Sequence, residues 1–559
     1  MDNLSNEDLI DRWTRKPAPL LPLLHAFHDR DGFLSDEALR EVSRALKIPL
    51  ADLFGTVSFY HHFTRTPEGR NAPRVCTGPI CCNRGADLIL DELRREGGGA
   101  MPCAGRCDEP VPVLRGGKAL VGESATSLES RPSPLPLVAP RLEGFEECVF
   151  HAIREPARDS MAGYRKPGGY AGLDLAVREL GPEKLVELVE ASGLAGRGGA
   201  GFPTGAKWRA VREAPGTPKT IVCNADEGEP GCFKDRAIMD YDPHAVVEGM
   251  LLAALATGAT RGFIYLRYEY PETFRTLERA IAEAEASRLV GEHSSIGHPF
   301  ELYVRRGAGA YICGEEGSLL NSLEGKHPFP RNRPPFPVTH GFENLPTVVN
   351  NVETLASVPQ IVRRGAEWYH GLGIGEHAGT KVISLSGDIQ RPGNYEVPIG
   401  FSLNTLLYDW AGGSREGRSI QAVTMAGLSG GFLAGDDLDV TLDEPSLRSK
   451  GSFLGAGGVM VFDDTRDMVG VAHGAMEFFA DESCGKCFPC RIGTRRLTER
   501  LASAGSLTVE NWLSEVRDIG DTMKATSACG LGIAAPLVTD SLMKHFRDQV
   551  SKHVNSTHR

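Results

Sequence analysis

The sequence of 559 residues has no apolar run of about 18 residues, no apolar core near its N-terminus and no excess of basic residues. A membrane-spanning helix needs about 20 apolar residues, so none is predicted. The first ten residues carry Asp2, Glu7 and Asp8, which does not fit a secretory signal peptide. The net charge of −12 argues against a nucleic-acid groove. These absences predict a cytoplasmic protein with no membrane span and no nucleic-acid partner.

The sequence also shows no paired nucleophile and base of the kind that covalent catalysis requires. What it has instead is thirteen cysteines. In a chain without a signal peptide, cysteines indicate metal or redox sites rather than disulfides. Nine of the thirteen fall within 76–107 and 484–529, and this grouping predicts two metal sites. At roughly 150 residues per domain, the length predicts three to five domains.

A glycine-rich stretch from Gly193 to Trp208 contains six glycines and ends in Lys207. Glycines let backbone N–H groups approach a ligand, and a lysine can add a positive charge. Such a stretch predicts a cradle for phosphate. Three of its glycines match the dinucleotide pattern G-x-G-x-x-G, which requires a preceding strand. The residues before it, 183–192, have helical spacing instead, so we expect a differently built nucleotide cradle; the alternative is a flexible linker.

Polar residues follow several apolar segments that have the pattern of strands. The strand predicted at 220–223 leads into an acidic turn, and those at 263–267 and 303–305 precede further loops, the second rich in glycine and acids. Ligand-binding loops of α/β proteins lie at strand ends, so a large cofactor pocket is favoured over independent surface loops. Two further segments, 333–337 and 346–354, complete the set. The side chains singled out in these loops and segments are Asn224, Asp226, Glu227, Glu229, Tyr311, Glu315, Glu316, Arg333, Phe336, Asn350, Asn351 and Thr354.

The N-terminal region is predicted to be helical over about 1–65, with His61 and His62 as packing or surface residues. Strands at 74–76 and 111–114 flank a helix at 86–93, and the loops beside them carry two cysteine pairs. Thiolates select zinc or iron–sulfur clusters, and this spacing leaves both possible. The four cysteines are Cys76, Cys81, Cys103 and Cys107.

The C-terminal region carries Cys-x2-Cys-x2-Cys and one remote cysteine, at Cys484, Cys487, Cys490 and Cys529. This spacing is typical of a 4Fe-4S cluster, whereas zinc more often uses two pairs. The remaining cysteines, apart from Cys82, are expected to be buried free thiols; they are Cys148, Cys223, Cys232 and Cys313.

These motifs resemble two subunits of respiratory complex I fused in one chain. Cys-x4-Cys with Cys-x3-Cys resembles its thioredoxin-like iron–sulfur subunit, which implies that Cys76, Cys81, Cys103 and Cys107 hold a 2Fe-2S cluster; the neighbouring Cys82 makes the second ligand ambiguous. Four further motifs resemble the NADH-oxidising subunit over about 160–545: Gly-Arg-Gly-Gly-Ala-Gly-Phe-Pro-Thr-Gly-x-Lys-Trp, Asn-Ala-Asp-Glu-x-Glu-Pro-Gly, Gly-Ala-Gly-Ala-Tyr-Ile-Cys-Gly-Glu-Glu and Asn-Asn-Val-Glu-Thr.

The second resemblance implies FMN, NAD(H) and the site residues. Those implied for FMN are Gly196, Gly198, Lys207, Asn224, Asp226, Gly314, Asn350, Asn351 and Thr354. Those implied around the nicotinamide nucleotide are Phe202, Glu229, Tyr311, Glu316 and Phe336. Neighbours also predicted to bind cofactor are Arg197, Gly199, Glu227, Glu315 and Arg333, and Glu229 and Glu316 are predicted to be catalytic. Two positions depart from the family: Arg333 replaces an expected lysine, and Ala210 an expected aromatic residue.

The predicted fold is multidomain α/β and α+β. Its parts are a helical segment (1–70), a thioredoxin-like 2Fe-2S domain (71–121), a linker (122–160), a Rossmann-like FMN/NADH domain (161–375), a ubiquitin-like β-grasp domain of the SLBB type (376–462) and a helical 4Fe-4S domain (463–559).

The predicted function is electron transfer between NAD(H) and iron–sulfur clusters through FMN, since a flavin can exchange both hydride and single electrons. Fused chains of this kind resemble subunits of soluble NAD-linked formate dehydrogenases and NAD-reducing hydrogenases. The complete N-terminal cysteine set favours a formate dehydrogenase partner carrying molybdenum or tungsten, with a hydrogenase as the alternative. A non-catalytic carrier or assembly scaffold is a third possibility.

Overall fold

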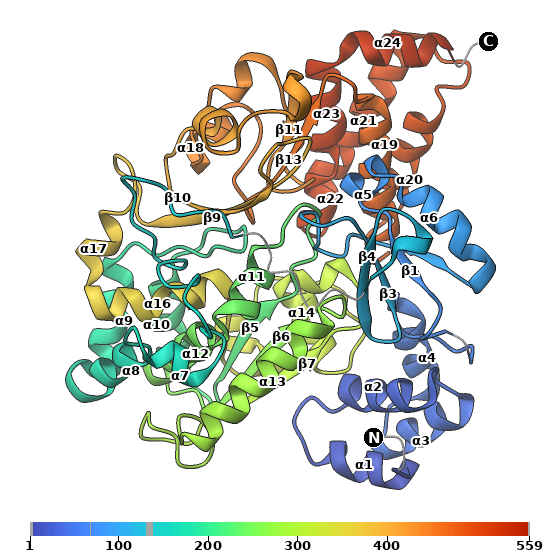
Figure 1. Ribbon diagram of the computed structural model, residues 1–559. Coiled ribbons are helices and arrows are strands. Elements are labelled where there is room, and N and C mark those ends of the chain that lie inside the picture. Colours follow the sequence, from blue (N-terminus) through green and yellow to red (C-terminus); the bar gives the residue numbers. More distant parts are fainter. Residues whose placement is uncertain (1–3, 68, 130–137, 557–559) are drawn as a thin grey trace.

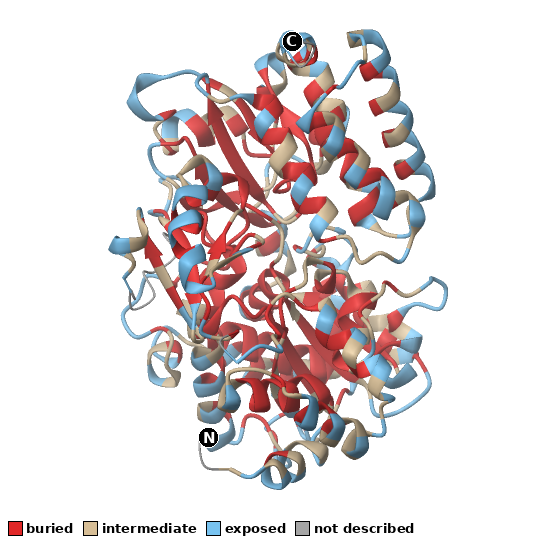
Figure 2. Cartoon of the chain, turned by 90° about the vertical axis from the view of Figure 1, so that its right-hand side faces the viewer, coloured by how far each residue is buried: buried red, intermediate tan, exposed pale blue. Residues whose placement is uncertain are grey.

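The computed structural model describes residues 4–67, 69–129 and 138–556. Figure 1 shows N-terminal helices at the lower right, C-terminal helices at the upper right, and the first small sheet between them. Two larger sheets form the rest of the molecule, and their strands are largely buried (Figure 2). Within the described residues, no helix is both long and apolar enough to cross a membrane.

The predicted N-terminal helical region is confirmed, and it covers one face of a sheet that lies far along the chain. Within it, α3 begins after Ser35 because the Ser35 side chain accepts a hydrogen bond from the backbone of Ala38. Leu24 and Phe27 pack in one core with Val222 and Phe263 of that sheet. The helices are α1 (Asn6–Thr14), α2 (Leu20–Asp31), α3 (Asp36–Leu46) and α4 (Leu50–Phe59).

The first sheet contains the strands predicted at 74–76 and 111–114, with the predicted helix at 86–93 on its face. Its strand order is β2-β1-β3-β4, with β1 parallel to β2 and antiparallel to β3. The elements are β1 (Arg74–Cys76), α5 (Pro79–Asn83), α6 (Ala86–Leu93), β2 (Gly99–Met101), β3 (Val111–Arg115) and β4 (Lys118–Gly122).

The segment predicted as a linker lies partly outside the described residues, at 130–137. Its later part packs closely: the Glu396 carboxylate accepts hydrogen bonds from the backbone N–H groups of Cys148, Val149 and Phe150 at 2.7, 3.0 and 2.6 Å. Burial of these three residues anchors the chain between the two larger sheets. The linker's boundaries stay a prediction.

The central sheet is parallel, in the order β7-β6-β5-β8. All its carboxyl ends therefore meet at one edge, which is where ligands bind in α/β sheets. Its strands are β5 (Thr220–Ala225), β6 (Arg261–Leu266), β7 (Glu301–Arg306) and β8 (Thr347–Asn351). The surrounding helices include α7 (Met161–Arg165), α8 (Ala171–Leu175), α9 (Gly181–Ala191), α10 (Thr204–Glu213), α11 (Lys234–Tyr241), α12 (Pro243–Thr257), α13 (Pro271–Ala286), α14 (Glu316–Leu323), α15 (Pro337–His340), α16 (Val352–Arg364) and α17 (Ala366–His370).

The third sheet is mixed, in the order β10-β9-β13-β11-β12, with β13 parallel to β9. Alternating apolar residues such as Ile383, Leu385, Val459 and Val461 fill its own core. The strands are β9 (Thr380–Gly387), β10 (Gly393–Pro398), β11 (Ile420–Thr424), β12 (Phe432–Leu433) and β13 (Gly458–Asp463), with α18 (Glu444–Ser449) before β13.

The C-terminal region is a bundle of helices, as predicted. Trp512, Phe479 and Leu497 are fully buried within it. The helices are α19 (Met468–Asp481), α20 (Phe488–Ala502), α21 (Val509–Thr526), α22 (Gly530–Ala534), α23 (Pro536–His545) and α24 (Arg547–Ser556).

Candidate functional site

The glycine-rich stretch forms the loop between α9 and α10 together with the first turn of α10, which carries Lys207. The helix predicted before the stretch is confirmed. Gly199 and Gly201 have φ values of +125° and +64°, in the region that favours glycine. A Cβ atom at Gly198 would lie only 3.1 Å from Cβ of Asn351. The Arg197 backbone N–H donates to Thr354 Oγ1 at 2.8 Å. The loop is thus held against the start of α16, at the carboxyl edge of the central sheet.

Lys207 also reaches this edge. Its Nζ donates to the Val349 carbonyl of β8 at 3.0 Å and lies 3.6 Å from Glu316 Oε2. The Phe202 ring is 5.8 Å from the same ammonium group and is 53% exposed. Phe336 is 52% exposed. Both exposed rings, of which Phe202 lies in the glycine-rich loop, are available to contact a planar ligand.

The turn after β5 faces the loop after β7. Asn224 Nδ2 donates to the Gly314 carbonyl at 2.8 Å, and Asn224 Oδ1 accepts from the Asp226 backbone at 3.2 Å. Asp226 Oδ2 is buried and has no hydrogen-bond partner among the described residues. Burial raises the pKa of Asp226 well above its usual value. An unpaired buried carboxyl oxygen is costly, and a bound ligand with a donor group would satisfy it.

Glu229 and Tyr311, predicted together, are in direct contact. Glu229 Oε2 accepts from Tyr311 Oη at 2.5 Å and from Ser429 Oγ at 2.8 Å, while Oε1 accepts from the Leu428 and Ser429 backbones. Burial raises the pKa of Glu229 despite these four bonds. Its carboxylate therefore joins the turn after β5 to the loop between β11 and β12. The sequence did not indicate this contact.

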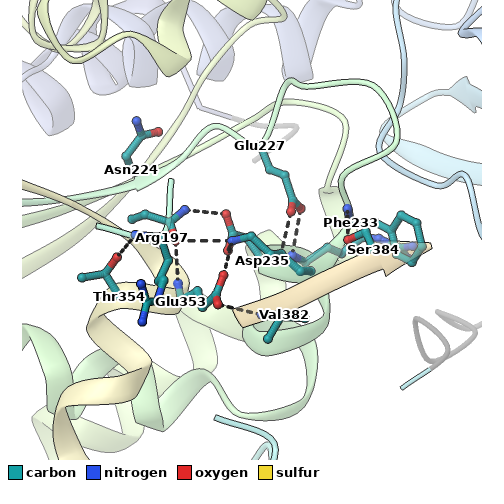
Figure 3. Close-up of polar contacts among 12 residues, drawn as sticks. Arg197, Asn224, Glu227, Phe233, Asp235, Glu353, Thr354, Val382 and Ser384 are labelled. Atoms are coloured by element: carbon teal, nitrogen blue, oxygen red, sulfur yellow. Dashed lines mark hydrogen bonds and ion pairs between the residues drawn. The ribbon is translucent and has the colours of Figure 1, made fainter. Parts of the chain in front are cut away.

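Glu227 lies in the same turn but points elsewhere. Its carboxylate accepts from the backbone N–H groups of Asp235 and Arg236 at 2.9 and 3.2 Å and from Tyr270 Oη at 2.9 Å. Figure 3 shows it directed at Asp235, at the start of α11. Burial raises the pKa of Glu227 to about 7. Its carboxylate oxygens thus serve the N-terminus of α11 and Tyr270, and the contact of Glu227 with a cofactor stays a prediction.

The two adjacent acids after β7 also differ. Glu315 caps α14 by accepting from the Ser318 backbone at 2.8 Å, and it contacts Arg333. Glu316 lies 3.0 Å from the same Arg333 guanidinium and faces Lys207. Arg333 therefore holds both acids at the mouth of the loop. Of the two, Glu316 is the one placed beside the cradle.

The two asparagines at the end of β8 also have different bonding partners. Asn350 Oδ1 accepts from the indole of Trp208 at 2.8 Å. Asn351 caps α16 by accepting from the Glu353 backbone at 2.9 Å, and its Nδ2 donates to Asp235 at 2.6 Å. These bonds fix Asn351 beside Gly198 and Asn350 against Trp208.

A buried ionic network beneath the cradle was missed at the sequence level. Lys381 Nζ, from β9, donates to the Arg197 carbonyl at 2.9 Å and to Glu353 at 2.6 Å. Lys234 lies 2.8 Å from Glu353 and 2.6 Å from Asp235. Burial lowers the pKa of Lys381 to about 8, whereas the two lysines outweigh burial and lower that of Glu353 to about 2. The Lys-Asp-Arg run after Phe233 was the available signal.

The four N-terminal cysteines gather at the end of β1. The Sγ atoms of Cys103 and Cys107 are 3.6 Å apart. Cys76 Sγ accepts from the Ala104 backbone at 3.3 Å. Cys76 and Cys81 are also neighbours, and all four side chains are buried. By contrast, the thiol of Cys82 is exposed and donates to the Thr77 carbonyl, so Cys81 is the better-placed second ligand.

The four C-terminal cysteines line one small pocket with Ile312 and Pro330 of the central domain. Cys490 is in α20, and Cys529 is the N-cap residue of α22. Burial raises the pKa of the Cys490 thiol to about 12, so its thiolate form needs a positive neighbour such as a metal. Because Ile312 lines this pocket, the pocket adjoins the loop that carries Tyr311.

The remaining predicted histidines and cysteines have other roles. His62 is buried and lies 3.0 Å from Glu269, and His61 lies 3.2 Å from Glu482. The other four cysteines are buried free thiols, as predicted: Cys148, Cys223, Cys232 and Cys313.

Three family models match the chain. They are the Thioredoxin-like [2Fe-2S] ferredoxin over residues 6–111, the Nuo51 FMN-binding domain over 189–360, and the NADH-ubiquinone oxidoreductase-F iron-sulfur binding region over 470–553. The first match resolves the choice between zinc and iron–sulfur in favour of a 2Fe-2S domain. The predicted mixed α/β organisation is confirmed at the level of these three domains.

Several relatives match most of the chain. The second F subunit of the NADH-quinone oxidoreductases of Rhizobium meliloti (strain 1021) is 44% identical over 414 residues, covering 73% of this chain and 98% of the relative. The NADP-reducing hydrogenase subunit HndC of Solidesulfovibrio fructosivorans is 44% identical over 400 residues, covering 71% and 81%. A crystal structure of an NAD+-reducing [NiFe]-hydrogenase in the H2-reduced state matches with a TM-score of 0.82 and 32% identity, covering 97% of this chain and 93% of the other.

The resemblance to the complex I subunits is thereby confirmed, as are the predicted cofactors: FMN, a 2Fe-2S cluster, a 4Fe-4S cluster and, as substrate, NADH. The chain belongs to the family of the F subunits of NADH-quinone oxidoreductase and is an NAD-linked oxidoreductase subunit with FMN-binding, 2Fe-2S and 4Fe-4S domains.

Proposed function

We propose that the cradle and the loops at the carboxyl edge of the central sheet hold FMN and align NAD(H) beside it. Three observations support the fit: the close approach at Gly198, the left-handed backbone at Gly199 and Gly201, and the unpaired oxygen of Asp226. Lys207 adds a positive charge suited to an anionic group. The residues proposed for FMN are Gly196, Arg197, Gly198, Gly199, Lys207, Asn224, Asp226, Gly314, Asn350, Asn351 and Thr354.

The nucleotide is proposed to enter between Phe202 and Phe336, the exposed rings beside the cradle. Glu229 and Glu316 are the carboxylates on this side, each held by a partner: Tyr311 for Glu229 and Arg333 for Glu316. Fixed carboxylates can orient a carboxamide and a ribose without reorganising. We assign them positioning of the nicotinamide.

Bound FMN supplies the exchange between a two-electron hydride and single electrons. The chain's own contribution is to place two sets of cysteines against the domain that binds it. Cys484, Cys487, Cys490 and Cys529 are proposed as the 4Fe-4S ligands, and their pocket includes Ile312. Cys76, Cys81, Cys103 and Cys107 are proposed as the 2Fe-2S ligands. The single observation that carries this function is the contact of both cysteine sets with the loops of the central sheet.

The flavin assignment is tested with Lys207→Met in the cluster-loaded chain. We expect wild type to bind one FMN non-covalently and to reduce ferricyanide with NADH, and the variant to lose flavin on dilution. Lys326→Met is the matched control, because Lys326 is exposed and paired only with nearby Glu324. Full flavin retention by Lys207→Met would remove this lysine from the site.

The partner is a separate proposal. The chain is proposed to exchange electrons with a catalytic subunit on another polypeptide, because its described residues show no paired nucleophile and base for a second substrate. The complete and buried 2Fe-2S cysteine set supports a molybdenum or tungsten formate dehydrogenase. The match of 97% of the chain to a hydrogenase structure supports a hydrogenase equally.

Isolation of the tagged chain from its native cells distinguishes the two partners. Molybdenum or tungsten with formate-dependent NAD+ reduction would support formate dehydrogenase. Nickel with hydrogen-dependent reduction, and no activity with formate, would overturn it in favour of a hydrogenase. Neither outcome affects the assignment of the NADH-oxidising subunit.

A further inference from the structure

One buried guanidinium joins the 2Fe-2S cysteine loop to the turn of the nucleotide site. Arg267 follows β6 at the carboxyl edge of the central sheet and is 5% exposed. Its Nη2 donates to the Cys103 carbonyl at 2.6 Å, and its Nη1 donates to the Glu227 carbonyl. The planar fork of arginine can hold two acceptors at once, which an ammonium group cannot do with the same geometry.

The cysteine loop packs directly on this arginine. Gly105, between Cys103 and Cys107, has a φ of +64°. A Cβ atom there would lie 2.1 Å from Tyr270 Oη and 2.9 Å from Arg267 Nη1. No side chain therefore separates the loop from the guanidinium, and its charge acts on Cys103 through protein rather than water.

The charge of Arg267 is partly balanced on its far side. Glu269 Oε2 accepts from Arg267 Nε at 3.0 Å, and Glu269 Oε1 lies 3.0 Å from Nε2 of His62. Burial alone would raise the pKa of Glu269, but Arg267 and His62 outweigh it and lower that pKa. The charge of Arg267 also acts on the Asp226 carboxylate, where it opposes the rise in pKa that burial causes. Arg267 is thus a fixed cation between Cys103 and three acidic or carbonyl groups.

We propose that Arg267 is a positioning residue that locks the Cys103 loop to the 226–229 turn and raises the reduction potential of the 2Fe-2S cluster. This proposal rests on the proposed function, in which Cys103 is a ligand of the 2Fe-2S cluster. Reduction adds one negative charge to the cluster, and a nearby positive charge stabilises the reduced form. Glu269 acts in the opposite direction, because its negative charge offsets part of the guanidinium's field.

The test is an EPR-monitored redox titration of the cluster-loaded chain, with the 4Fe-4S signal of the same sample as internal reference. In Arg267→Gln we expect the ratio of reduced to oxidised 2Fe-2S at a fixed potential to fall about tenfold, which equals about 59 mV for one electron. The 4Fe-4S potential should stay unchanged. Arg267→Lys keeps the charge and should recover most of the shift. Arg261→Gln is the matched control, because Arg261 begins the same strand at its opposite end and pairs with Glu343.

Glu269→Gln is a second test, which does not require that the Arg267→Gln variant folds. Removing this carboxylate should shift the 2Fe-2S potential upward, opposite to Arg267→Gln, whereas general damage to the loop would not reverse its sign. A 2Fe-2S potential that moves in neither Arg267→Gln nor Glu269→Gln, or moves the same way in both, would overturn the proposal. A wild-type chain with iron and sulfide for the 4Fe-4S cluster but no 2Fe-2S signal would instead overturn the assignment of Cys103.

Discussion

At the scale of single residues, Glu229 is the most constrained carboxylate of the nucleotide site. It accepts four hydrogen bonds, from Leu428, twice from Ser429, and from Tyr311. We expect Glu229→Ala to lower kcat/KM for NADH by about 10- to 100-fold, corresponding to roughly 1.5–3 kcal/mol for bonds to a charged group. FMN content should not change. Tyr311→Phe removes one of the four bonds and should have a smaller effect; steady-state kinetics with ferricyanide measure both, and wild-type kinetics in Glu229→Ala would contradict the role.

Lys381 reaches the flavin cradle from a different sheet. Its ammonium group holds the Arg197 carbonyl and pairs with Glu353. We expect Lys381→Met to raise the Kd for FMN about 10-fold or more, because the cradle loses a charged donor worth roughly 1.5–3 kcal/mol. Fluorescence titration of the flavin-free chain measures the change, with Lys326→Met as an exposed control. An unaltered Kd for FMN in Lys381→Met would show that this ionic network stabilises the fold without contributing to FMN binding.

Sequence patterns predicted which residues gather at the candidate site but not the direction of each side chain. Asn224 reaches the shared edge because parallel strands place their carboxyl ends together. Lys207 reaches it from α10, through the Val349 carbonyl of β8. Glu227 belongs to the same motif, yet it serves the backbone of α11. Arg267 and Lys381 carried no motif, since their roles come from contacts with loops more than 150 residues away. Pairing across such distances cannot be read from local spacing.

At the scale of elements, strands and helices with clear periodicity were predicted well. β5 and α6 agree with the prediction because apolar residues repeat at the spacing of each element. The packing of residues 148–150 was not predicted, because Pro and Ser around them are typical of linkers, while their backbone bonds come from Glu396. The ubiquitin-like identity of the mixed sheet stays a prediction, supported by the parallel pairing of its first and last strands.

Helix α2 carries two buried histidines and should be a point of acid sensitivity. Burial lowers the pKa of His28 to about 4, and it lowers that of His25 well below 6.5. Between pH 6.5 and 4 the unfolded chain therefore binds more protons than the folded chain, so the free energy of unfolding falls as pH falls. The titration of His28 alone should lower the free energy of unfolding by about 1 kcal/mol at pH 5.5.

Hydrogen exchange of the α2 amides at pH 7.5 and 5.5, corrected for intrinsic rates, measures this cost. His28→Gln should show a smaller loss of protection than wild type, since glutamine does not titrate. His340→Gln, at an exposed position, should behave like wild type. Equal protection at both pH values in the wild-type chain would show that α2 does not open in this range.

At the scale of the whole molecule, both cysteine sets meet the carboxyl edge of the central sheet from different directions. The N-terminal set touches it through Arg267, and the C-terminal set through Ile312. Figure 1 shows the first sheet between the two helical regions, which brings residues near position 100 close to the C-terminal bundle. Cys103 and Phe479 indeed belong to one apolar cluster. A hydride acceptor bound at this edge would thus have a cluster on two sides.

This arrangement predicts two clusters that fail independently. Iron and sulfide analysis of the fully loaded chain should give about six of each, four from one cluster and two from the other. Cys529→Ser should remove the 4Fe-4S EPR signal and keep the 2Fe-2S signal, and Cys103→Ser should do the reverse. Cys82→Ser is the control, because its exposed thiol lies outside the buried set. Stoichiometric zinc in anaerobically prepared protein, or loss of the 2Fe-2S signal in Cys82→Ser, would require a different ligand assignment.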